Sequence, residues 1–145
     1  MTTPETQAVT TMSEDECWAL LSSRTLGRLA TSVDGYPDIF PVNYVVQRRS
    51  ILIRTAEGTK LASAAINERV AFEADDHDVM RGWSVVVKGQ ARVLSSGEEL
   101  AAAERAQVLP WTATPKSRFI RIVALEITGR RFQFGAEPEH LYDLG

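Results

Sequence analysis

Cysteine is almost absent from the sequence, which has only Cys17 among its 145 residues. A lone cysteine excludes an internal disulfide and is typical of a reducing compartment, so we expect a cytoplasmic protein. Long apolar stretches are absent as well: no run of about 18 apolar residues occurs, which predicts no membrane span. The N-terminus has no basic segment followed by an apolar one, so we expect no signal peptide.

An excess of positive charge is also missing. The chain has 16 basic and 19 acidic residues, a net charge of -3. It therefore has no overall positive field to attract nucleic acid or an anionic membrane, and we expect neither as a partner. Its hydrophobic content of 44% is ordinary for a globular protein, and a chain of this length can bury a substantial core.

The motifs of several common sites are missing. The nine glycines never stand two apart, which excludes G-x-G-x-x-G, and no G-x-x-x-x-G-K-[ST] occurs. "GWSVV" lacks the last glycine of the hydrolase motif G-x-S-x-G. Two isolated histidines, His77 and His140, predict no metal site, and "EADDHD" is more typical of a solvated strand end than of a cation site. No catalytic side chain is identified, so any chemistry is expected to come from a cofactor.

The local patterns predict one domain, residues 12–145, after a polar tail of residues 1–11 that we expect to be disordered. A helix is predicted from Ser13, because Glu16 completes a capping box with it. Strands are expected at 26–33 and 36–46, joined by a tight turn at Asp34-Gly35. Pro37 and Pro41 place the start of the second strand at a sheet edge or a bulge.

The remaining elements alternate between strands and short helices. Strands are predicted at 51–56, 69–75 and 83–94, and helices at 58–67 and 96–109. Residues 119–134 form one long strand, or two strands joined at Gly129. The short connections predict an α+β fold on a mostly antiparallel sheet, and closure into a barrel would remove its exposed edges.

The stretch "RTAEGTK", residues 54–60, concentrates positive charge at the end of a strand and the start of a helix. Arg54 can bind phosphate oxygens bidentately and Lys60 adds a second charge, close to backbone N–H groups that favour anions. Thr55 and Ser63 contribute hydroxyls nearby. Two interpretations stay open on these residues alone: a phosphate site, or a solvated charged turn.

The order of segments "LGRLAT…DGYPDIFPVNYVV…ILIRTAEGTKLASAAINERVAFEAD…GWSVVVKGQARVL" resembles the pyridoxamine 5′-phosphate oxidase-like, flavin-binding split-barrel superfamily. It is most similar to the small members related to nitroimidazole-resistance proteins, and the resemblance covers residues 13–134. The resemblance implies a split β-barrel with short flanking helices. It also implies a homodimer that binds FMN, or in some branches a deazaflavin or haem, at the dimer interface.

The same resemblance implies the residues that bind the cofactor. The phosphate would contact Arg54, Thr55, Lys60 and Ser63. Val42 and Asn43 would lie beside the flavin ring, and Trp83 and Ser84 would approach it from a later strand, often that of the partner subunit. For Trp83 the alternative is an ordinary core or interface aromatic, and for Asn43 a strand amide satisfied within the sheet.

The C-terminal segment departs from the family pattern. "GRRFQFGAEPEHLYDLG" does not match the arginine- and histidine-containing end that binds substrate phosphate in pyridoxamine phosphate oxidases proper, so we do not expect vitamin B6 oxidation. The resemblance favours an FMN-binding oxidoreductase that transfers two electrons to or from a small organic substrate. Alternatives are a deazaflavin-dependent reductase, whose acidic cofactor tail Arg48 or Arg49 would help to hold, and a non-catalytic flavin-binding or sensing module.

The strand "FIRIVALEI" supports the homodimer independently. Ile120 and Ile122 lie on one face, and Phe119, Val123 and Leu125 on the other. A strand that is apolar on both faces is expected to be buried on both, and we assign the second face to contact with another copy of the chain.

Overall fold

The computed structural model describes residues 8–55, 58–108 and 118–135, while the side chains of residues 59–62 are not described. In chain order its elements are β1 (Val9–Thr11), α1 (Glu14–Ser22), β2 (Leu26–Val33), β3 (Tyr36–Gln47), β4 (Ser50–Thr55), α2 (Thr59–Ile66), β5 (Arg69–His77), β6 (Arg81–Val93), α3 (Gly97–Arg105) and β7 (Arg118–Gln133). Within these ranges, no helix has both the length and the apolar character that crossing a bilayer requires.

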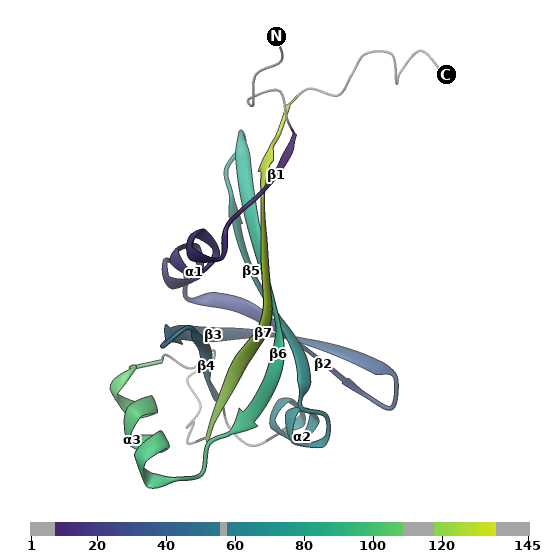
Figure 1. Cartoon of the computed structure of the whole chain (residues 1–145). Coiled ribbons are helices and arrows are strands. Elements are labelled where there is room, and N and C mark those ends of the chain that lie inside the picture. The colour runs from purple at the N-terminus through teal and green to yellow at the C-terminus, as the bar shows by residue number, and fades with distance from the viewer. Residues whose placement is uncertain (1–7, 56–57, 109–117, 136–145) are drawn as a thin grey trace.

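The strands form a closed antiparallel barrel. Their order is β1-β7-β4-β3-β2-β5-β6, and β6 pairs in turn with β7, which closes the ring of β2 to β7. Figure 1 shows β5, β6 and β7 continuing beyond the barrel as a long arm that β1 accompanies, with α2 and α3 at the opposite end. The predicted α+β fold with a split barrel and short helices is confirmed.

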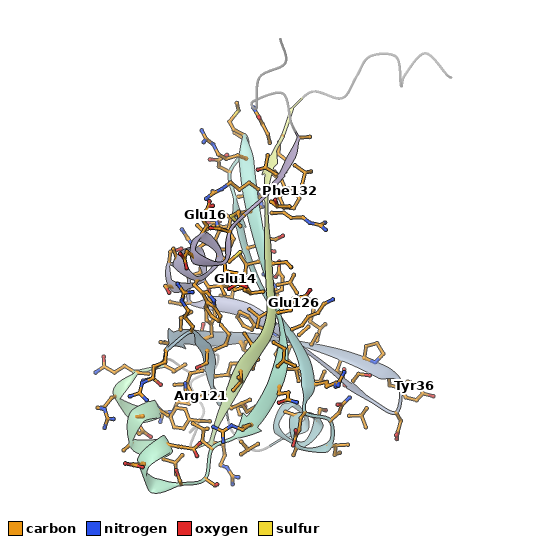
Figure 2. The ribbon with its side chains drawn as sticks, viewed as in Figure 1. Glu14, Glu16, Tyr36, Arg121, Glu126 and Phe132 are labelled. Carbon is orange, nitrogen blue, oxygen red and sulfur yellow. The ribbon has the colours of Figure 1, made fainter. Side chains whose placement is uncertain are left out.

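Most local predictions are confirmed for the reasons given. Ser13 and Glu16 form the capping box of α1. Asp34 and Gly35 have φ values of 52° and 80°, as a tight turn between antiparallel strands requires. β3 pairs with β4 only from Tyr44 onward, so its proline-containing first part has β2 as its one strand neighbour among the described residues. Figure 2 shows Tyr36 at the tip of this projecting hairpin.

One prediction at the N-terminal end needs correction, and the structure decides between two alternatives at the C-terminal end. Residues 9–11 are not disordered but form β1, which pairs with residues 130–132 of β7; residues 1–7 lie outside the described ranges. Of the two alternatives for residues 119–134, the single long strand is confirmed, as Arg118–Gln133. Both follow from the length of β7, whose edge offers backbone groups to the passing N-terminal segment.

The core has two parts. The larger part fills the barrel, where buried Tyr44 donates its hydroxyl proton to the Leu21 carbonyl oxygen at 2.6 Å and packs edge-on against Phe72. The smaller part lies between the outer face of the sheet and α3 and contains Leu52, Leu94, Ala103, Val108 and Phe119.

The smaller cluster corrects the reasoning about β7. The sequence assigned the outer face of Phe119 to a second copy of the chain, but α3 of the same chain covers it, and Phe119 is 1% exposed. Further along the strand the expected apolar surface does occur, because Val123 and Leu125 are 42% and 67% exposed.

Candidate functional site

The end of β4 holds the first of the predicted binding residues. Ile53 faces the barrel core, so strand alternation turns Arg54 to the outer face and Thr55 inward, where it is 3% exposed. The Arg54 guanidinium lies over the Phe119 ring, 5.6 Å from its centroid, in a cation–π contact. This contact orients the positive charge at the end of the strand.

Three residues, 56–58, connect β4 to the start of α2. Its N-cap is Gly58, which makes no side-chain capping hydrogen bond, and the first turn contains no acidic residue. The first backbone N–H groups of the helix therefore have no side-chain cap and no carboxylate in that turn, an arrangement that favours anions. Ser63 is buried on this helix. Lys60 belongs to the first turn, but its side chain lies outside the described residues.

The sheet brings Val42 and Asn43 next to this region. Tyr44 of β3 and Ile53 of β4 form the last pair of their ladder, and Asn43 and Arg54 are the next residues beyond that pair on the two strands. The Val42 side chain is 1% exposed in the barrel core, which leaves only its backbone to meet a ligand. Thus Val42, Asn43, Arg54 and Thr55 lie on neighbouring strands where the β3–β4 ladder ends, and the chain continues from there into α2, which carries Lys60 and Ser63.

Trp83 and Ser84 lie elsewhere in the same chain. Arg54 pairs with Phe119 on β7, whereas Trp83 pairs with Arg131, twelve residues further along the same strand. At about 3.3 Å per residue, this separation is roughly 40 Å of strand. One chain therefore does not bring these two residues to Arg54.

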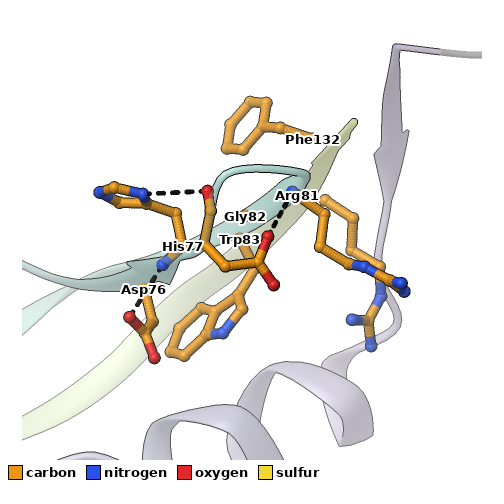
Figure 3. A pocket seen from close by; sticks show the side chains of 8 residues that line it. Asp76, His77, Arg81, Gly82, Trp83 and Phe132 are labelled. Carbon is orange, nitrogen blue, oxygen red and sulfur yellow. Dashed lines mark hydrogen bonds between the residues drawn. The ribbon is translucent and has the colours of Figure 1, made fainter. Parts of the chain in front are cut away.

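A pocket of about 260 Å³ adjoins Trp83 at the β5–β6 hairpin, between the hairpin and β7. Figure 3 shows Trp83, Arg81 and Phe132 around it, with His77 on the β5 side. Asp78 shapes the hairpin by accepting hydrogen bonds from the backbone N–H groups of Met80 at 2.7 Å and of Arg81 at 2.8 Å. These bonds lower the pKa of the Asp78 carboxyl.

Sequence reasoning missed three members of this pocket: Arg81, Arg131 and Phe132. They come from β6 and β7, and only the pairing of those strands unites them. A local signal was available only for the hairpin itself, because an aspartate before a short connection commonly accepts hydrogen bonds from the backbone that follows.

Sequence reasoning also missed a charged cluster on the outer face of β2 and β5. One nitrogen of Arg28, Nη1, donates to Glu73 Oε1 at 3.0 Å and to Asp75 Oδ1 at 3.2 Å. Burial, together with the hydrogen bond and charge of Asp75, raises the pKa of Glu73 to about 7. The hydrogen bond from Glu73 lowers the pKa of the Asp75 carboxyl.

Comparisons with known proteins define the chain's relatives. The uncharacterized protein Rv3129 of Mycobacterium tuberculosis is 57% identical over 95 residues, which are 66% of this chain and 86% of that protein. The FAD binding protein of Mycobacterium smegmatis is 54% identical, with a TM-score of 0.77 over 86% of this chain and 99% of that one. A proposed pyridoxamine 5′-phosphate oxidase of Corynebacterium glutamicum is 42% identical, with a TM-score of 0.83 over 90% and 98%.

The sequence profile described as pyridoxamine 5′-phosphate oxidase matches residues 13–131, most of the chain and nearly the range over which the segment order resembled that superfamily. The chain therefore belongs to the pyridoxamine 5′-phosphate oxidase family.

Proposed function

We propose that the protein binds a flavin nucleotide at the β4–α2 junction and transfers two electrons to or from a small organic substrate. The observation that carries this proposal is the FAD-binding relative, which is 54% identical and covers 86% of the chain. The start of α2, which follows Arg54 in the chain and has no side-chain cap, supports it, because a helix N-terminus of this kind suits a phosphate.

The residues of the junction fit the phosphate of a flavin. Arg54 would donate two parallel hydrogen bonds to its oxygens, and the first N–H groups of α2 would donate along the helix axis. Lys60 would add a second positive charge to this set, whereas the Thr55 and Ser63 side chains are buried. Val42 through its backbone, and Asn43 through its backbone or amide, would lie beside the ring. A bound flavin supplies the hydride chemistry, which no side chain of the protein replaces.

The proposal also concerns which flavin the protein binds. FMN is the cofactor that the family resemblance implies, whereas the FAD-binding relative favours the dinucleotide. Both carry the same phosphate on the ribityl chain, so the junction would serve either. The deazaflavin alternative differs in its longer acidic tail. We take FMN as the reference ligand and test the other two against it.

We also propose that the active form is a homodimer. Roughly 40 Å of strand separates Trp83 from Arg54, so both would contact one flavin only if they belonged to different copies of the chain. The exposed apolar side chains of Val123 and Leu125 offer surface for such a contact. Light scattering is expected to give twice the 16.0 kDa chain mass, and a monomer mass would refute this part of the proposal.

The first test of the function is flavin binding. Purified protein, stripped of any bound cofactor, is titrated with FMN, FAD and a deazaflavin while ligand fluorescence is followed. We expect quenching at micromolar concentrations of FMN or FAD. No quenching by any of the three would overturn the proposal, and tighter deazaflavin binding would replace the cofactor.

The second test addresses the residues. Arg54→Ala is expected to weaken flavin binding by about 1.5–3 kcal/mol, the range for hydrogen bonds to charged groups, or roughly 10- to 150-fold in Kd. The control is Lys88→Ala, which removes a charge from an exposed position on β6 that pairs with Glu126. If both variants bound flavin with equal affinity, residues 54–60 would be a solvated charged turn rather than a phosphate site.

The third test separates an enzyme from a binding module. Bleaching of the flavin absorbance by NADH or NADPH, followed by its return with an organic electron acceptor, is the outcome we expect of an oxidoreductase. Tight flavin binding without reduction would favour a non-catalytic or sensing role. We place the protein in the cytoplasm, where its buried free thiol at Cys17 would stay reduced.

A further inference from the structure

A second polar cleft lies away from the β4–α2 junction, between α3 and the turn that joins β3 to β4. Its volume is about 550 Å³. The turn contributes Arg48 and Arg49, the sheet contributes Arg92 and Arg121, and α3 contributes Arg105. Figure 2 shows Arg121 on the part of β7 that faces α3.

The cleft has the opposite charge to the rest of the protein. Its five arginines face two glutamates, Glu98 and Glu99, which leaves a net charge of +3 on a chain whose total is -3. Glu99 lies 3.5 Å from Arg92, and Arg49 pairs with Asp15 of α1. In the described part of the chain, Arg48 and Arg105 form no ion pair. With Asp15 counted beside the two glutamates, the carboxylates leave two of the five positive charges uncompensated.

Arg92 and Arg121 are the most unusual pair in the cleft. They lie directly opposite each other on β6 and β7, where like charges destabilise a sheet. Arg121 is held in place by neutral groups: it donates to Ser50 Oγ and to Gln47 Oε1, both at 2.8 Å. Gln47 in turn donates to the Ala102 carbonyl of α3 at 3.1 Å.

This network fixes the guanidinium of Arg121 without cancelling its charge. The two bonds use two of its five N–H donors and leave the others for a ligand. Burial, together with the charges of Arg92 and Arg48, lowers the pKa of Arg121, which agrees with an excess of positive charge around it.

The β3–β4 turn adds an independent observation. Arg48 and Arg49 have φ values of 53° and 52°, in the left-handed region that asparagine and glycine usually occupy in such a turn. Backbone strain of this kind costs roughly 1–3 kcal/mol per residue and is concentrated at functional sites. Two successive arginines therefore occupy positions where the backbone favours asparagine or glycine. We connect their presence with the positive charge that they bring to the cleft.

We propose that this cleft binds a small oxyanion with two or three negative charges, such as a phosphate ester or a di- or tricarboxylate. An anion between Arg92 and Arg121 would relieve their repulsion and accept their charge-assisted hydrogen bonds. The site goes beyond the proposed flavin function. It lies at the start of β4, and its lining does not include Arg54; Leu52 and Phe119, which pair with Arg121 and Arg54 in the sheet, pack under α3 next to it.

The test uses pyrophosphate and citrate as probes, each titrated calorimetrically into the full-length protein. We expect at least one to bind, and the stronger of the two identifies phosphate or carboxylate as the preferred group. Arg92→Gln, an exposed position, is expected to weaken binding about tenfold or more. Glu98→Gln is expected to strengthen it, because it removes a negative charge from the cleft.

Lys88→Gln is the matched control, since it removes one positive charge from β6 outside the cleft. No binding of either anion in the millimolar range would overturn the proposal, as would equal weakening in Lys88→Gln and Arg92→Gln. Thermal denaturation of each variant establishes that it is folded. If bound FMN or FAD displaced the probe, the cleft would be part of the flavin site and the separate site would be refuted. Failure of flavin binding leaves these outcomes unchanged.

Discussion

Replacement of Gly89 by alanine is expected to destabilise the barrel at the seam between β6 and β7. The register of these strands shifts between Lys88 and Gly89, where a bulge brings the backbones close together. A Cβ atom at Gly89 would lie 2.1 Å from the Val123 carbonyl oxygen and 3.2 Å from the Ala124 Cα atom. Both are backbone atoms of a neighbouring strand, so they cannot rotate away as a flexible side chain could.

The magnitude follows from this geometry. Overpacking a filled site usually costs about 1–3 kcal/mol, and contact with backbone favours the upper end of that range. Alanine recovers roughly 0.5–1 kcal/mol because it restricts the unfolded chain more than glycine does. We therefore expect a net loss of about 2 kcal/mol in the free energy of unfolding, or roughly 4–8 °C in Tm for a chain of this size.

The assay is urea denaturation at constant temperature, with calorimetry for Tm. Gly97→Ala is the control, because a Cβ atom at Gly97 would meet nothing within 4 Å and this residue begins α3. We expect that variant to be as stable as the wild type or more stable by up to about 1 kcal/mol. A Gly89→Ala protein as stable as Gly97→Ala would refute the reasoning about the seam.

Two further predictions concern groups that the fold buries. Tyr44→Phe removes the hydroxyl that donates to the Leu21 carbonyl oxygen and should cost about 1–3 kcal/mol in urea denaturation, with an unchanged m-value. Because the pKa of Glu73 rises from 4.5 to about 7 on folding, the folded state binds more protons in that interval, and the free energy of unfolding should fall as pH rises through it. In Glu73→Gln the free energy of unfolding should not show this decrease with pH. An equal pH dependence in both proteins would contradict the assignment of the raised pKa to Glu73.

Sequence reasoning was most successful where neighbouring residues determine the structure. The capping box of Ser13 and Glu16 and the Asp34-Gly35 turn depend on contacts within a few residues, so their patterns are readable in the chain. The alternation in β6 is equally local, because successive side chains of a strand point to opposite faces of the sheet and only one of those faces is apolar. Family membership also followed from the order of such segments.

The relative positions of the candidate site residues required the tertiary structure. Arg54 and Asn43 both follow Tyr44–Ile53, the last pair between β3 and β4, whereas the register of β6 on β7 carries Trp83 to the other end of the sheet. The same register opposes Arg92 and Arg121, which no local pattern indicates.

By itself, the sequence determined the antiparallel elements, their turns and the family to which they belong. Which strand closes the barrel, that α3 covers Phe119, and which charges face one another were decided only by the tertiary structure. The physical reason is that strand register and barrel closure come from pairings between residues far apart in the chain. Their free energy depends on the whole arrangement rather than on any segment.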